Sequence, residues 1–104
     1  MELWTNPECS KSRSAQDILD ERKIPYTVRL YLEDPPTRQE LEALLTTLQA
    51  PASAISRGPQ GTNDQVIEAL VEDPTLIQRP IALHEGRAVV ARPPERVLEL
   101  LTGP

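Results

Sequence analysis

One cysteine carries most of the chemistry that this sequence could perform. Cys9 lies in the run 6–13 (Asn-Pro-Glu-Cys-Ser-Lys-Ser-Arg), between a short apolar opening and a segment with helical spacing. A thiol at the start of a helix faces unpaired backbone N–H groups and the positive end of the helix dipole, which both favour the thiolate. Lys11 and Arg13 add positive charge nearby. A buried structural cysteine is the alternative, but the polar neighbours favour a reactive thiol.

Cys9 and Ser12 have the spacing Cys-x-x-Ser. In a Cys-x-x-Cys pair the second thiol attacks a mixed disulfide on the first, whereas a serine hydroxyl can only donate a hydrogen bond to the sulfur. A covalent intermediate on Cys9 would therefore need a thiol from another molecule to resolve it. Ser12 could equally be a first-turn residue favoured for capping, and the sequence leaves both interpretations open.

Arg57, Arg79 and Arg92 each directly precede a glycine or a proline. A guanidinium on a restricted backbone suits two-pronged contacts with a tetrahedral oxyanion. Taken singly, each of the three is better interpreted as a solvated surface arginine. An oxyanion site is indicated only if the fold brings them together. His84 is interpreted as a structural or exposed strand residue. One histidine and one cysteine give no metal site of the usual spacing.

The composition limits the class of protein. A net charge of −5 argues against a nucleic-acid or anionic-membrane surface. A single cysteine cannot form an internal disulfide. No apolar run approaches the length of a membrane span, and no signal-peptide pattern is present. We therefore expect one cytoplasmic domain over residues 1–104, with no bound cofactor or metal.

The apolar patterns predict an element order of βαβ, then helices, then ββα. Strand patterns at 1–5 and 26–32 flank a helical segment at 10–22. Near the other end, strands at 80–84 and 87–91 are joined by a Glu-Gly turn, which is typical of a hairpin.

Three further helices are predicted. Capping boxes at Thr37 with Glu40 and at Thr62 with Gln65 begin two of them, and a Pro-Pro-Glu sequence at 93–95 begins the last. The side chains expected on the inner faces of the second and third of these helices are Val66, Ile67, Leu70, Val71, Val97, Leu98 and Leu101.

This order matches a thioredoxin-like α/β fold. We expect a small mixed four-stranded sheet flanked by helices, with a helical insertion between the βαβ and ββα parts. In such a fold the loop ahead of the third strand passes beside the cysteine. That loop would place Arg79 at the site, and it makes Pro80 a candidate cis proline.

Four segments carry a resemblance when taken in their order along the chain. They are 6–13, 30–38 (Leu-Tyr-Leu-Glu-Asp-Pro-Pro-Thr-Arg), 79–81 (Arg-Pro-Ile) and 92–95 (Arg-Pro-Pro-Glu). Together they resemble the glutaredoxin-coupled arsenate reductase family. The resemblance implies a thioredoxin-like fold and a cytoplasmic enzyme of arsenic detoxification that reduces arsenate to arsenite.

The same resemblance implies roles for the candidate residues. Cys9 would be the nucleophile that attacks arsenate, and Ser12 would hydrogen-bond its thiolate. Arg57, Arg79 and Arg92 would hold the oxyanion and stabilise the arseno-cysteine. Glutathione, as co-substrate, would release arsenite, and glutaredoxin would clear the mixed disulfide.

The chain departs from the family pattern at two positions near these residues. Many members have histidine where this chain has Thr5, and the segment after Arg57 is shorter here. We therefore expect Arg57 to contribute least. Two other functions stay open: a glutathione-dependent thiol oxidoreductase without arsenate activity, and a Spx-type regulator that binds RNA polymerase. The Arg-Pro-Pro-Glu sequence at 92–95 favours the reductase branch.

Overall fold

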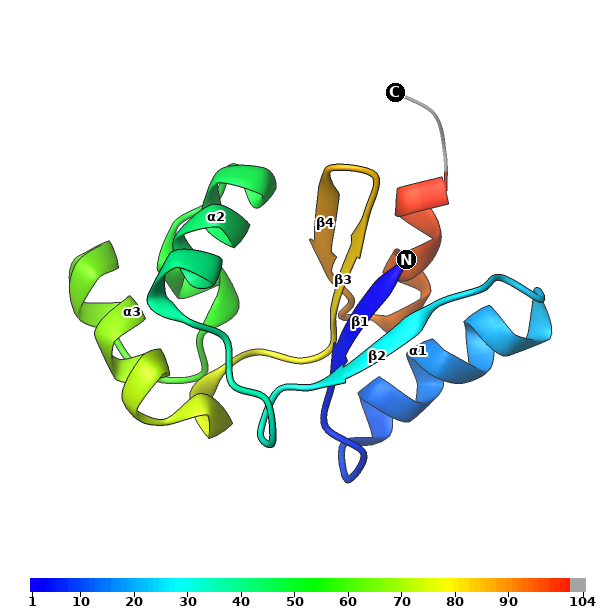
Figure 1. Cartoon of the computed structure of the whole chain (residues 1–104), viewed down its shortest axis with the longest axis horizontal. Helices are drawn as coiled ribbons and strands as arrows, with labels where there is room; N and C mark the ends of the chain where they lie inside the picture. The colour runs from blue at the N-terminus through cyan, green and yellow to red at the C-terminus, as the bar shows by residue number, and fades with distance from the viewer. Residues whose placement is uncertain (102–104) are drawn as a thin grey trace.

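A four-stranded sheet forms the middle layer of the structure, a computed structural model that describes residues 1–101 (Figure 1). Its strands are β1 (Glu2–Thr5), β2 (Thr27–Leu30), β3 (Ile81–His84) and β4 (Arg87–Val90). They lie in the spatial order β2-β1-β3-β4. Because β1 runs parallel to β2 and antiparallel to β3, while β3 and β4 form a hairpin, the sheet is mixed as predicted.

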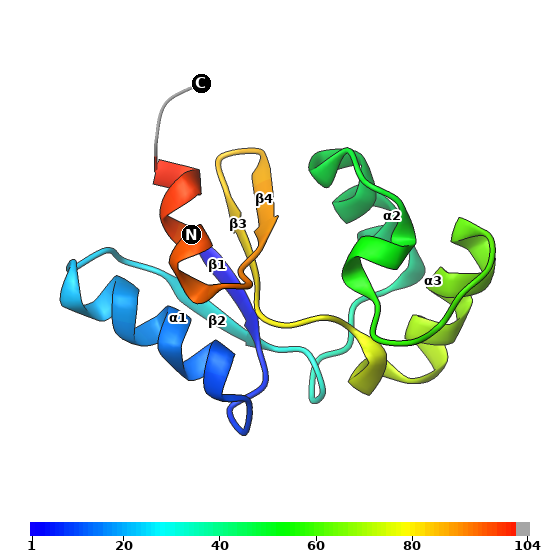
Figure 2. The same cartoon turned by 180° about the vertical axis from the view of Figure 1, so that it is seen from behind.

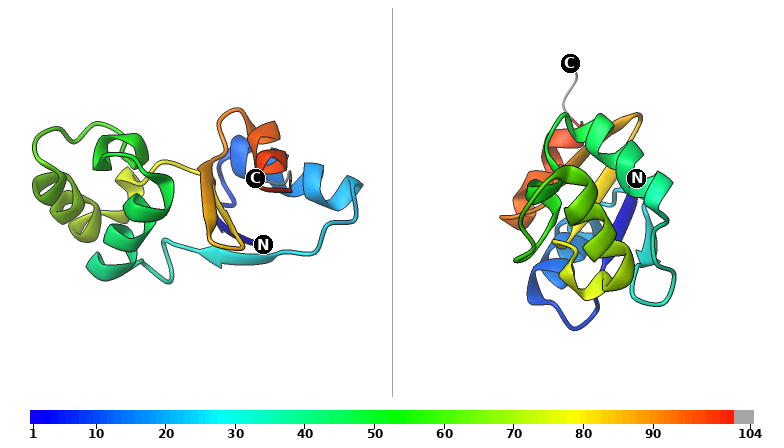
Figure 3. Two further views of the ribbon diagram at one scale, coloured as in Figure 1. Left: turned by 90° about the horizontal axis from the view of Figure 1, so that it is seen from above. Right: turned by 90° about the vertical axis from the view of Figure 1, so that its left-hand side faces the viewer.

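Helices cover both faces of this sheet (Figures 2 and 3). One face is covered by α1 (Ser10–Glu21) and by the final 3₁₀ helix η3 (Pro94–Leu101). The other is covered by an insertion that contains α2 (Arg38–Leu48) and α3 (Asn63–Glu72). Two short 3₁₀ helices complete the insertion: η1 (Ala52–Ile55) and η2 (Pro74–Leu76). The predicted order of βαβ, inserted helices and ββα is confirmed.

Both predicted capping boxes form. The Glu40 N–H donates to the Thr37 hydroxyl at 3.1 Å, and the Thr37 N–H donates to the Glu40 carboxylate at 3.0 Å. The corresponding distances between Thr62 and Gln65 are 3.2 Å and 2.9 Å. Each box satisfies two backbone N–H groups that would otherwise lack a partner, which fixes the starts of α2 and α3.

A separate apolar cluster packs against each face of the sheet. Successive side chains of a strand point to opposite faces, so Leu3 joins the cluster under α1 while Trp4 joins the cluster under the insertion. The first cluster also contains Ala15, Leu19, Ala82, Val89 and Val97. The second also contains Tyr31, Leu41, Leu44, Ile55, Val66, Leu70 and Ile81.

Two side chains that the sequence placed inside are exposed. Val71 and Leu101 each retain about 42% of their accessible surface. Val71 lies at the border of the apolar stripe of α3. The last helix is a 3₁₀ helix, in which a three-residue turn aligns Pro94, Val97 and Leu100, so Leu100 is buried where Leu101 was expected.

The strand predicted at 26–32 ends earlier, at Leu30. The Leu30 carbonyl accepts hydrogen bonds from the N–H groups of Glu33 and Asp34 at 2.9 and 2.8 Å, which forms a turn. This turn takes Tyr31 out of the strand at its carboxyl end. The Tyr31 side chain is fully buried in the cluster under the insertion.

Candidate active site

The loop between β1 and α1 presents Cys9 at the N-cap position of α1. The Cys9 N–H donates to the Asn6 carbonyl at 2.9 Å, and the Glu8 N–H donates to the Asn6 side-chain oxygen at 3.0 Å. Asparagine side chains favour this kind of local turn. Cys9 makes no side-chain capping hydrogen bond and is half-buried, so its thiol remains available for chemistry.

The thiol of Cys9 is acidic. Burial by itself raises its pKa, but hydrogen bonds from the Ser12 backbone, the Arg79 side chain, the Lys11 backbone and the Ser12 side chain lower it, from 9.0 to about 7 overall. Near pH 7 about half of the molecules therefore carry the thiolate, against a few per cent for an ordinary cysteine. Lys11 acts through its backbone N–H. Arg79, and not the predicted Lys11 or Arg13, is the main charged partner.

Ser12 links the sulfur to the loop. It is fully buried, and its Oγ accepts the Asn6 N–H at 3.2 Å. A hydroxyl that accepts one hydrogen bond keeps its own proton to donate, and the Ser12 side chain lowers the pKa of Cys9. Capping is not its role, because Cys9 occupies the N-cap position.

Arg79 approaches Cys9 from the loop before β3. The Arg79–Pro80 peptide bond is cis, as the sequence predicted. The side chain is half-buried and donates from Nη1 to the Thr75 carbonyl at 3.4 Å. Its Nε is buried and has no hydrogen-bond partner in the part of the chain that the structure describes. Arg79 therefore reaches the thiol with donor capacity to spare.

Arg92 lies against the same loop. Its Nη1 donates to the Arg79 carbonyl at 2.9 Å. The Arg92–Pro93 bond is also cis, which the sequence did not predict. Arg92 and Gln78 line a groove of about 450 Å³ between the insertion and β4. This groove gives Arg92 an open side toward solvent.

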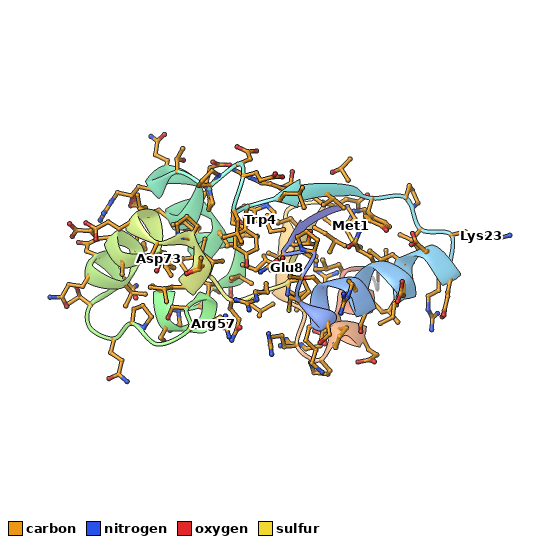
Figure 4. The ribbon with its side chains drawn as sticks, turned by 90° about the horizontal axis from the view of Figure 1, so that it is seen from below. Met1, Trp4, Glu8, Lys23, Arg57 and Asp73 are labelled. Atoms are coloured by element: carbon orange, nitrogen blue, oxygen red, sulfur yellow. The ribbon has the colours of Figure 1, made fainter. Side chains whose placement is uncertain are left out.

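Arg57 is better anchored than the sequence suggested. Its N–H donates to the Leu76 carbonyl at 2.8 Å, within a bridge that ties the end of η1 to the segment leading to Arg79. Its side chain is exposed and lies at the edge of the insertion that faces the sheet (Figure 4). Burial raises the pKa of Tyr31, and the charges of Arg79 and Arg57 oppose that rise. Arg57 therefore lies within electrostatic reach of Tyr31, as Arg79 does.

Tyr31 is the residue of this site that the sequence missed. Its hydroxyl is buried and makes no hydrogen bond of normal geometry within residues 1–101. Burial has the largest effect on the pKa of Tyr31 and raises it, and Arg79 has the next largest effect and lowers it. Negative charge on Cys9 also raises this pKa. In the sequence Tyr31 was one aromatic residue in a predicted strand, and nothing in that pattern marked its hydroxyl.

Some buried polar atoms of these segments lack a hydrogen-bond partner. Among residues 1–101, the buried side-chain atoms without a hydrogen-bond partner are Thr5 Oγ1, Tyr31 Oη, Gln78 Oε1 and Arg79 Nε. Thr5 and Tyr31 lie at the carboxyl ends of the parallel strands β1 and β2, and the other two lie in the loop before β3. Each such atom costs about 1–3 kcal/mol. Tyr31 and Arg79 lie within reach of one another, so this pair indicates a place for water or a polar ligand.

Other kinds of site receive no support from the described residues. Over residues 1–101, no three His, Cys, Asp or Glu side chains gather in a way that could hold a metal ion. Within the same range, none of the helices is long and apolar enough to cross a membrane. His84 lies on β3 and is half-buried, with its Nε2 3.9 Å from a Glu85 carboxylate oxygen.

A mixed four-stranded sheet covered by helices on both faces, with an acidic thiol at the start of the first helix, defines a protein of the thioredoxin-like class. The chain belongs to the ArsC family, which it matches over residues 4–100. The solved structure of "Arsenate reductase from Vibrio cholerae" superimposes with a TM-score of 0.87 at 35% identity, covering 96% of this chain and 98% of that one.

The chain is similar in sequence both to relatives called arsenate reductase and to relatives without an assigned activity. A protein from Neisseria meningitidis serogroup B called arsenate reductase is 35% identical, over 97% of each chain. A Streptomyces viridochromogenes protein described only as an uncharacterized protein in the glnII region is 41% identical, over 98% of this chain and 99% of the relative. The family is therefore established, whereas the reaction requires its own argument.

Proposed function

We propose that this protein reduces arsenate to arsenite, with Cys9 as nucleophile and glutathione as the external thiol. The observation that carries the proposal is the Cys9 thiol, which has a pKa of about 7 and receives a hydrogen bond from Arg79. The unpaired Nε of Arg79 and the Tyr31 hydroxyl can both donate a hydrogen bond, which supports an oxyanion as the ligand. Relatives named arsenate reductase support arsenate as that oxyanion.

In the first step, the Cys9 thiolate attacks the As(V) centre of arsenate. A sulfur–arsenic bond forms and one oxygen leaves as water after protonation. Arg79, Arg92 and Arg57 would bind the remaining oxygens through charge-assisted hydrogen bonds, which guanidinium groups make in pairs. The Lys11 and Ser12 backbone N–H groups at the start of α1, which hydrogen-bond the Cys9 sulfur, stabilise the attacking thiolate.

In the second step, glutathione attacks the Cys9 sulfur. The sulfur–arsenic bond breaks, and its electron pair stays on arsenic, which leaves as arsenite. Two thiols have then supplied two electrons, and they remain joined as a Cys9–glutathione disulfide. Because Cys9 is the only cysteine of the chain, glutaredoxin or a second glutathione must reduce this disulfide. We place the reaction in the cytoplasm, where glutathione is kept reduced.

The test is arsenite release in the presence of glutathione and glutaredoxin. We expect multiple turnovers by the wild type and none by Cys9→Ser, which replaces only the nucleophilic atom. Thermal unfolding of Cys9→Ser checks that the fold is intact. Mass spectrometry of the wild type after oxidation with glutathione should find a single adduct, on Cys9.

The outcomes separate the alternatives. A wild type that forms the adduct and exchanges it with glutaredoxin, but never releases arsenite, would be a glutathione-dependent thiol oxidoreductase. A wild type that neither forms the adduct nor binds an oxyanion would favour a regulator of Spx type. Turnover with every external thiol excluded would contradict the second step.

A further inference from the structure

The Tyr31 hydroxyl has an unusual environment. The ring packs in the apolar cluster that contains Trp4 and Leu41, and the whole residue is fully buried. Its hydroxyl nevertheless lies within hydrogen-bonding reach of Arg79 and electrostatic reach of Cys9 and Arg57, and it makes no hydrogen bond of normal geometry among residues 1–101. A tyrosine placed only for packing would not need this oxygen atom.

The chemistry of the neighbouring groups indicates what is missing. A guanidinium has only donors, so Arg79 can engage the lone pairs of the Tyr31 oxygen and cannot accept its proton. The Tyr31 O–H therefore requires an acceptor. Because Arg79 also hydrogen-bonds the Cys9 thiol, an anion bound at Cys9 would lie within reach of Arg79 and could accept the Tyr31 proton.

We propose that Tyr31 is an additional binding residue of the oxyanion site: its hydroxyl donates a hydrogen bond to the anion that Cys9 attacks. Its oxygen is oriented by Arg79 on the other side. This inference rests on the proposed function and adds to it a neutral donor that reaches the anion from the insertion side of the sheet. A neutral donor binds an oxygen of the anion without adding to the three positive charges already there.

The chain offers a matched control, because it contains two tyrosines. The Tyr26 hydroxyl donates to an Asp20 carboxylate oxygen at 2.9 Å, near the C-terminal end of α1, where the bond is exposed. Tyr26→Phe removes a hydroxyl whose proton has an acceptor, whereas Tyr31→Phe removes one whose proton has no acceptor among residues 1–101. Both substitutions keep the ring.

The experiment titrates each variant with sodium arsenate and follows two signals: the rise of the unfolding temperature and the protection of Cys9 from alkylation. For Tyr31→Phe we expect arsenate affinity to fall by roughly 10–100-fold, the range for a hydrogen bond to a charged group. Its unfolding temperature without arsenate should equal or exceed that of the wild type. Tyr26→Phe should bind arsenate as the wild type does and should unfold at a slightly lower temperature.

A spectroscopic readout does not depend on the stability of Tyr31→Phe. In Tyr26→Phe, Tyr31 is the only tyrosine left, so arsenate should change the tyrosine absorption of that variant. Equal arsenate affinity in Tyr31→Phe and wild type, or no absorption change, would overturn the role of Tyr31. If the wild type itself binds neither arsenate nor phosphate, the oxyanion site is wrong and the proposed function fails with it.

Discussion

Arg29 and Arg79 are both half-buried, and both lie close to the sheet, yet their surroundings differ. Arg29 donates from Nε to the Asp34 carbonyl at 3.0 Å, forms a two-pronged ion pair with Glu40 and stacks over the Trp4 ring, 5.0 Å from its centroid. Arg79 hydrogen-bonds the Cys9 thiol and makes a long hydrogen bond of 3.4 Å to the Thr75 carbonyl, and its Nε has no partner among the described residues.

The difference separates a structural arginine from a binding arginine. The donors of Arg29 are occupied by the turn after β2 and by the first turn of α2, so it joins these two elements and has little to offer a ligand. Arg79 keeps donors available beside an acidic thiol. The extent to which polar groups are satisfied, and not residue type, indicates which arginine can do chemistry.

The largest effects should come from replacing each of the two arginines with alanine in separate variants. Arg79→Ala should lower kcat/KM for arsenate by about 10²–10³, because a charge-assisted contact made in the transition state is lost. Arg29→Ala should leave kcat/KM close to that of the wild type and lower the free energy of unfolding by about 1–3 kcal/mol, since Glu40 loses its partner. Steady-state kinetics and urea unfolding measure the two quantities.

Lysine variants and the other two arginines sharpen this test. Arg79→Lys should recover little activity, because an ammonium keeps the charge and loses the planar fork. Arg92→Ala should lose nearly as much as Arg79→Ala, and the exposed Arg57 should matter less. Similar rates for all three alanine variants and the wild type would remove the arginine site altogether.

A smaller effect is expected on the acidity of Cys9. The rate of Cys9 alkylation should rise with pH through a midpoint of about 7, so the protein loses its nucleophile as pH falls below that value. Arg79→Ala should move the midpoint upward, toward the ~8.5 of a free thiol, whereas Arg29→Ala should leave it unchanged. A wild-type midpoint at or above ~8.5 would rule out an activated thiolate.

Local sequence signals predicted much of this molecule. The cis bond before Pro80 was predicted from the place of its loop in a thioredoxin-like fold. The capping boxes at Thr37 and Thr62 and the hairpin between β3 and β4 follow from residues within a few positions of one another. The position of Cys9 at the start of α1 could be predicted for the same reason. Burial was harder, because a 3₁₀ end to the chain shifted the inward position from Leu101 to Leu100.

Contacts between distant segments could not be predicted in this way. The positive charge that acts on Cys9 comes from Arg79, seventy positions away, and not from its neighbours Lys11 and Arg13. The anchoring of Arg57 depends on a bridge between its neighbour Ser56 and Ile77, which no local sequence pattern predicts. The unpaired hydroxyl of Tyr31 results from the packing of the insertion against the sheet, which a strand pattern does not describe. The roles proposed for Cys9, Ser12 and the arginines remain predictions until the variants are measured.

The smallest effect is expected for Glu40, the ion-pair partner of Arg29. Hydrogen bonding from Arg29, and then from the Thr37 backbone, lowers the pKa of Glu40 from 4.5 to about 2. A carboxylate whose folded-state pKa is lowered stabilises the fold above its ordinary pKa, and this contribution disappears as pH falls toward the folded value. The Glu40 side chain is 41% exposed, so solvent screening limits its contribution to about 1 kcal/mol.

Glu40→Gln should therefore lower the free energy of unfolding by about 1 kcal/mol at pH 7, and the difference from wild type should vanish near pH 2. Glu42→Gln is the matched control on the same helix, because Glu42 makes only an exposed pair with Arg38 at 3.4 Å, and its effect should be near zero at both pH values. Urea unfolding at the two pH values measures these differences.

Neither variant should change arsenate turnover at pH 7, because the Arg29–Glu40 pair holds α2 against the turn after β2 and leaves Cys9 and Arg79 untouched. A loss of turnover in Glu40→Gln without a loss of stability would mean that the Arg29–Glu40 pair affects the reaction at Cys9. The distinction between a structural Arg29 and a binding Arg79 would then be wrong.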